Sequence, residues 1–158
     1  PYRDFELSVD YRLTPGANSG IKYRVAPGTG SVGLEYQLLD DARHPDAKMG
    51  RDGNRTLAAL YDLIAPQNLL DPPNPGKRIN PPGEWNRAVI VVRGNHVEHW
   101  LNGFKMVESE RGSPEFRQAV AQSKFAGQQG FGTWAESPIL LQDHGDRVDF
   151  RSIKIRQF

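Results

Sequence analysis

Side chains able to carry out acid–base chemistry alternate with apolar residues in two stretches expected to form strands. Glu35 and Gln37 alternate with leucine and tyrosine in the segment 33–40, and Gln142 and His144 share one side of a later segment. A carboxylate can act as a general base or bind a metal, and an imidazole transfers protons near neutral pH. Glu35 and His144 are therefore candidate catalytic residues, with Gln37 and Gln142 as candidate substrate-binding residues.

Two basic side chains are expected on the same polar face. Lys22 and Arg24 lie two residues apart in the segment 19–24, opposite Ile21 and Tyr23. They could bind substrate or stabilise a developing negative charge. A solvated sheet face with ordinary cross-strand ion pairs would give the same pattern, and 143–146 could equally be a tight turn.

Loop and aromatic residues complete the predicted site. His44 and Asp46 follow the strand 33–40 in a turn-rich loop, and loops at sheet ends often carry chemistry. Tyr61 and Trp134 could stack on a sugar ring, although either could be a core residue. His96 and His99 are three positions apart on one expected strand, so their side chains should point to opposite faces. The two are therefore not expected to share a ligand.

No cofactor follows from the residues, although a divalent metal is a candidate. Glu, His, Asp and Gln supply suitable nitrogen and oxygen ligands, but no spacing in the sequence demands a metal. There is no cysteine, which excludes disulfides, thiolate metal sites and a cysteine nucleophile.

The elements that must position these residues are predicted to be short strands. The 158 residues suit one domain, and 16 glycines with 12 prolines favour many turns and an all-β architecture. One short helix is expected near 113–125, with Ser113 as its cap and Pro114 at its first position. Arg93-Gly94-Asn95 and Asn102-Gly103 predict hairpin turns, whereas 56–64 is open between a turn of helix and a short strand.

Charge and hydropathy limit the classes of binding partner that the chain is expected to have. A net charge of +1 with no basic block argues against nucleic acid, and no apolar run approaches a membrane span. The chain opens at Pro1 inside a strand pattern, so we expect a further N-terminal segment, a missing strand included, or a neighbouring domain.

Several stretches together resemble one family, the 3-keto-disaccharide hydrolases. They cover nearly the whole chain in order: 18–21, 33–40, 83–86, 90–103, 141–145 and 148–155. The resemblance implies a concanavalin-like jelly-roll β-sandwich of two antiparallel sheets and bacterial origin. It also implies periplasmic or secreted localisation and cleavage of glycosides oxidised to a ketone at C3.

Classical glucanases of this fold provide a contrast, because they carry Glu, Asp and Glu at relative positions 0, 2 and 5. The matching residues here are Glu35, Gln37 and Asp40, so the middle carboxylate is absent. Glu35 and Asp40 are expected on opposite strand faces, whereas retaining hydrolysis needs two carboxyl groups about 5–5.5 Å apart.

The hypothesis is therefore a hydrolase or lyase acting on an oligosaccharide or glycoside by proton abstraction at C2, elimination from C1 and hydration. Glu35 or His144 would be the base. Lys22, Arg24 or a metal would stabilise the enolate. The alternatives are a non-catalytic, lectin-like carbohydrate-binding module and a structural domain of a larger protein.

Overall fold

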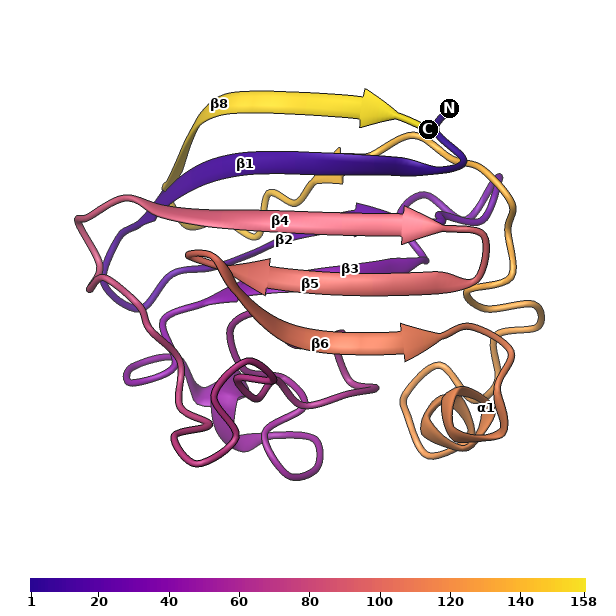
Figure 1. Ribbon diagram of the computed structural model, residues 1–158, viewed down its shortest axis with the longest axis horizontal. Helices are drawn as coiled ribbons and strands as arrows, with labels where there is room; N and C mark the ends of the chain where they lie inside the picture. Colours follow the sequence, from indigo (N-terminus) through magenta and orange to yellow (C-terminus); the bar gives the residue numbers. More distant parts are fainter.

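Two antiparallel sheets pack face to face in the computed structural model, which describes residues 1–158 (Figure 1). The larger sheet has the order β6-β5-β4-β1-β8. Its strands are β1 (Phe5–Leu13), β4 (Asn86–Arg93), β5 (His96–Leu101), β6 (Phe104–Glu110) and β8 (Val148–Gln157). The smaller sheet has the order β3-β2-β7. Its strands are β2 (Asn18–Tyr23), β3 (Leu34–Leu39) and β7 (Leu140–Leu141). The predicted concanavalin-like jelly-roll sandwich is confirmed.

The core lies between the two sheets and contains the apolar half of each alternating strand. In β1 every second residue from Phe5 to Leu13 is buried, and in β3 Tyr36 and Leu38 are fully buried. The Tyr36 hydroxyl donates a hydrogen bond to the Trp100 carbonyl oxygen of β5, which joins the two sheets directly. Because side chains alternate along a strand, this inward set turns the intervening polar residues to the outer faces.

The two predicted hairpin turns and the predicted helix are confirmed, with one difference in length. β4 and β5 join through Gly94–Asn95, and β5 and β6 join through Asn102–Gly103. The helix α1 (Pro114–Ala121) begins after Ser113, whose hydroxyl accepts a hydrogen bond from the Phe116 N–H. It ends four residues before the predicted boundary at 125 because a turn follows it.

The segments between β3 and β4 contain one short 3-10 helix, η1 (Pro45–Lys48), and otherwise turns. Residues 56–64 form neither a helix nor a regular strand. Instead Leu60 makes isolated bridges to Tyr36 and Ile64, which fix this segment beside β3. No helix of the chain is long and apolar enough to cross a membrane.

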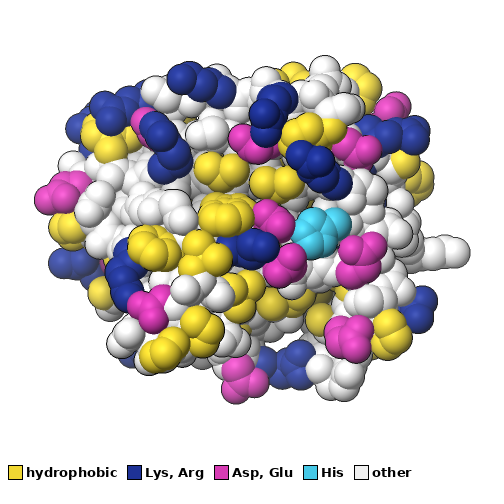
Figure 2. All heavy atoms as spheres, in the orientation of Figure 1, with side chains coloured by type: hydrophobic (Ala, Val, Ile, Leu, Met, Phe, Trp, Pro, Cys, Tyr) yellow, Lys and Arg dark blue, Asp and Glu magenta, His cyan; other side chains and the backbone are white.

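Charged side chains on the outer face of the five-stranded sheet pair with one another. Figure 2 shows this face, with a histidine among acidic and basic side chains. His96 and Lys105 both pair with Glu98 there. His99 points the other way and is fully buried, as the alternation predicts.

The buried His99 connects β5 to β2 through one ring nitrogen and to the segment 56–64 through the other. Nδ1 lies 3.1 Å from the Ala58 carbonyl oxygen and Nε2 lies 2.8 Å from the Tyr23 hydroxyl. A carbonyl only accepts, so Nδ1 carries the proton and the Tyr23 hydroxyl donates to Nε2. Burial disfavours the charged ring and lowers the pKa of His99 to about 4, from 6.5.

We expect His99 to make the fold sensitive to acid. Between pH 6.5 and 4 the unfolded chain binds a proton that the folded chain rejects, so stability present above pH 6.5 is lost as the pH falls. From pH 7 to pH 5 this contributes a loss of about 2 kcal/mol in the free energy of unfolding. Urea unfolding of wild type and His99→Gln at both pH values measures it. A variant with the wild-type pH dependence would contradict the assignment.

Candidate active site

The polar face of the three-stranded sheet forms one wall of a cavity of about 600 Å³. The core-facing residues of β2 and β3 lie on the other side of the sheet, so the cavity is outside the sandwich core. The other walls come from residues just before β3, the loops after β3, the turn after α1 and the segment after β7. The lining residues that carry the argument are Lys22, Glu35, Gln37, Tyr61, Lys124 and His144.

Glu35 is a buried carboxylate at the base of this cavity. It lies opposite Lys22 in the β2–β3 register, with Lys22 Nζ 3.6 Å from Glu35 Oε2. Burial raises the pKa of Glu35 above its ordinary value, although Lys22, Lys124 and His144 act in the opposite direction. Glu35 therefore combines a pKa moved toward neutrality with a position in a cleft, as expected for a general base.

Space for this carboxylate depends on a glycine in the neighbouring strand. A Cβ atom at Gly20 would lie 2.0 Å from Glu35 Oε1, which is far inside contact distance. Gly20 has an ordinary extended φ, so its role here is steric rather than conformational. β2 therefore leaves a gap into which the Glu35 side chain fits.

Gln37 lies beside Glu35 on the same face and is tied to the loops that cover β3. Its Nε2 donates to the Arg55 carbonyl oxygen at 3.2 Å, while its buried Oε1 has no partner. Asp46 accepts hydrogen bonds from the Tyr61 hydroxyl at 3.0 Å and from Arg55 Nη1 at 3.2 Å. These contacts hold the Gln37 amide against the covering loop and keep Tyr61 in the cavity wall.

Two imidazoles face each other at the cavity. The rings of His44 and His144 meet edge to face with centroids 6.4 Å apart. His44 Nδ1 accepts a hydrogen bond from the Asp46 N–H, so the proton of the neutral His44 ring lies on Nε2. The backbone of Gln142 bonds to Gly20 and Ser19, which fixes the segment that carries His144 against β2.

The structure thus brings together eight of the ten residues predicted for the site. They are Lys22, Glu35, Gln37, His44, Asp46, Tyr61, Gln142 and His144. Their chemical roles stay predictions.

The prediction that Arg24 shares this polar face is wrong. Arg24 follows the last residue of β2 and has φ +51°, in the left-handed region, so the strand alternation ends before it. Its side chain is buried and its Nη2 lies 3.6 Å from Asp4 Oδ1. It lines no part of the cavity around Glu35.

The structure places Trp134 outside this cavity. Trp134 lines a separate hollow with Arg3 and Val25, on the loop between Gly132 and the bridge from Tyr2 to Ser137. Trp134 and Tyr61 therefore line different hollows, and a sugar-stacking role for Trp134 stays a prediction.

Sequence reasoning missed Lys124 and Phe125, which line the cavity from the turn after α1. Strand alternation carries no information on a turn that reaches the sheet from a distant part of the chain. It also missed Asn18 and Met49.

Glu35, His44 and His144 are the cavity's candidate metal ligands, but their ligand atoms do not gather within 4.8 Å of one another. Such a group is formed by His96, Glu98 and Glu108 on the other sheet, where Lys105 already pairs with both carboxylates. A divalent metal at the cavity stays a prediction.

Sequence comparison now decides the family. Residues 1–156 match the family described as the 3-keto-alpha-glucoside-1,2-lyase-like domain. The chain belongs to this family. It is 33% identical over 180 residues to a curated relative from Bacteroides thetaiotaomicron named 3-keto-disaccharide hydrolase, covering 98% of this chain. The chain spans 59% of the length of that relative.

Solved structures of two candidate glycosyl hydrolases from Parabacteroides distasonis resemble this member of the 3-keto-alpha-glucoside-1,2-lyase-like family. The first has a TM-score of 0.81 and 29% identity and covers 99% of this chain and 73% of its own. The second has a TM-score of 0.68 and 25% identity and covers 99% and 79%, respectively.

We expect Gly20→Ala to expel the Glu35 carboxylate from its gap. The new methyl group would push the carboxylate toward solvent, so the pKa of Glu35 should fall back toward its ordinary value of 4.5. A carbon-13 NMR titration of the glutamate carboxyl groups measures this change. Gly76→Ala is the matched control, because a Cβ there meets nothing within 4 Å. An unchanged Glu35 titration in Gly20→Ala would contradict the steric argument.

Proposed function

We propose that this domain cleaves glycosides whose C3 carries a ketone. The ketone acidifies the proton at C2, and a base removes it, so that the C–H electron pair forms an enolate with the C3 oxygen. The electron pair then returns, C3=O re-forms, the C1–O bond breaks and the aglycone oxygen takes a proton. Addition of water across C1 and C2 completes a net hydrolysis.

The observation that carries the proposal is the environment of Glu35. A single carboxylate, buried and with a raised pKa, lies at the base of a sugar-sized cavity. Proton abstraction next to a carbonyl needs one such base and a means of stabilising negative charge. The name of the curated relative, 3-keto-disaccharide hydrolase, supports the proposed substrate class.

The other acids near Glu35 are poorly placed for the two-carboxylate chemistry of ordinary glycosidases. Asp40 turns away from the cavity and accepts hydrogen bonds from the Gly16 N–H and Arg43. Asp46 lines the cavity but is occupied by Tyr61 and Arg55. A mechanism with one base therefore suits the site better than a pair of carboxylates.

The remaining residues suit the orientation of a sugar and the transfer of a second proton. Gln37 lies beside Glu35 in the cavity lining and is the residue we assign to orienting the sugar. The exposed His144 lines the same cavity as Glu35 and is the group we assign to protonating the departing aglycone. Lys22 keeps the Glu35 carboxylate ionised until it takes the proton.

We expect turnover of a 3-keto-glucoside and none of the corresponding unoxidised glucoside. Glu35→Gln and His144→Ala should each lower the rate by roughly 10²-fold or more, because each removes a proton-transfer group. Proton NMR in D₂O follows both product formation and loss of the C2 proton signal. Glu84→Gln is the control, because Glu84 is exposed on another loop.

The outcomes separate the alternatives. Binding of the keto-glucoside without product or C2 exchange would favour a carbohydrate-binding module. Equal turnover of both sugars would point to an ordinary glycosidase. Full activity in both site variants would remove the assignment of Glu35 and His144.

A further inference from the structure

Lys124 places an ammonium group at the cavity that has no acidic partner. Its Nζ makes no ion pair within 4.0 Å and no hydrogen bond to the protein, whereas Lys22 Nζ bonds to Ser31 and pairs with Glu35. The nearest group described for it is the Tyr61 ring, whose centroid lies 4.6 Å away. An ammonium group held against an aromatic face, with no other charged partner, can bind a negatively charged ligand atom.

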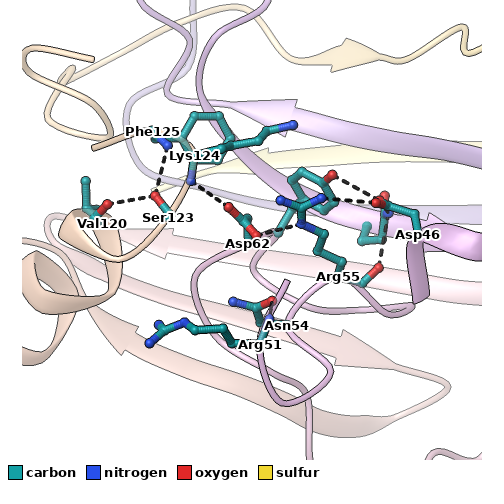
Figure 3. Close-up of polar contacts among 11 residues, drawn as sticks. Asp46, Arg51, Asn54, Arg55, Asp62, Val120, Ser123, Lys124 and Phe125 are labelled. Carbon is teal, nitrogen blue, oxygen red and sulfur yellow. Dashed lines mark hydrogen bonds and ion pairs between the residues drawn. The ribbon is translucent and has the colours of Figure 1, made fainter. Parts of the chain in front are cut away.

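The turn that carries Lys124 is anchored on both sides. The Lys124 N–H donates to Asp62 Oδ2 at 2.8 Å, and Asp62 Oδ1 accepts from Arg55 Nε at 2.6 Å. The Ser123 hydroxyl donates to the Val120 carbonyl oxygen at the end of α1. Figure 3 shows this chain of contacts, with Arg55 between Asp46 and Asp62. The position of the Lys124 backbone is thereby fixed relative to the floor of the cavity.

The charge balance of the proposed reaction requires such a cation. When Glu35 takes the C2 proton it becomes neutral, and the negative charge moves to the C3 oxygen of the sugar. Lys22 pairs with Glu35, so the Lys22 charge stabilises the carboxylate before the proton moves. A second positive charge is needed on the sugar side of the cavity once the enolate forms.

We propose that Lys124 is the residue that binds the C3 oxygen and stabilises the enolate, an inference that rests on the proposed function. Lys124 and Glu35 line the same cavity of about 600 Å³, which places both side chains around one bound sugar. The Lys124 ammonium donates a hydrogen bond to the C3 oxygen as the C–H electron pair moves onto that oxygen. This hydrogen bond weakens again when the C3=O double bond re-forms. The role that the sequence suggested for Arg24 falls to Lys124.

The test compares Lys124→Met, Lys124→Arg and the control Lys154→Met, whose lysine is exposed on β8 of the other sheet. Exchange of the C2 proton of a 3-keto-glucoside into D₂O is followed by NMR. Lys124→Met should slow exchange by about 10²-fold or more, the loss typical of one charge-stabilising donor. Lys124→Arg should recover at least a tenth of the wild-type rate, and Lys154→Met should match wild type. Exchange in Lys124→Met within twofold of wild type would overturn the inference while leaving the proposed function intact.

If the wild-type chain shows no turnover, the proposed function fails. A separate binding measurement still tests whether Lys124 binds an enolate anion. L-ascorbate under nitrogen is a stable enolate anion of a sugar lactone, and methyl α-D-glucopyranoside is its uncharged control. Calorimetry should give an ascorbate Kd at least tenfold higher for Lys124→Met than for wild type, with the glucoside Kd unchanged. An ascorbate Kd unaffected by Lys124→Met, or no ascorbate binding to wild type, would overturn the role of Lys124.

Discussion

The burial of one carboxylate, Glu35, sets the requirements for the strands and loops around it. A carboxylate can leave water at tolerable cost only beside a compensating charge, and Lys22 supplies that charge from the directly opposite position of β2. Gly20 supplies the space two residues earlier. The same short stretch of β2 thus provides both the room and the countercharge, which is why its register with β3 matters more than its length.

The register of β2 and β3 depends in turn on the core behind them. Tyr36 and Leu38 are fully buried between the sheets, so a shift of one residue would turn them to solvent and Glu35 into the core. The Tyr36 hydroxyl also bonds across to β5. Covering loops shield the outer face, and as a result all six residues of β3 are buried although only half of them face the core.

Strand alternation explains which parts of this arrangement could be predicted from the sequence. It placed Glu35 and Gln37 on one face and predicted the hairpins, because period-two patterns and turn residues act locally. It failed for Arg24, where a left-handed backbone conformation ends the alternation. It gave no information on Lys124 or Trp134, since a loop's position depends on contacts, such as that from Asp62 to the turn after α1, between residues far apart in the sequence.

The two outer faces of the sandwich differ in how completely their charges are satisfied. On the five-stranded sheet, Asp10 is paired with two arginines and Glu98 with a lysine, a histidine and an indole N–H. Such mutual pairing leaves little capacity for a ligand. At the cavity beside the three-stranded sheet, Lys124 from the turn after α1 has no acidic partner, and Gln37 Oε1 has no donor. A buried polar atom without a partner costs free energy, as Gln37 Oε1 does. The exposed Lys124 ammonium incurs no such cost and is free to pair with a ligand. Binding of a negatively charged ligand is therefore favoured on the face where Lys124 has no acid.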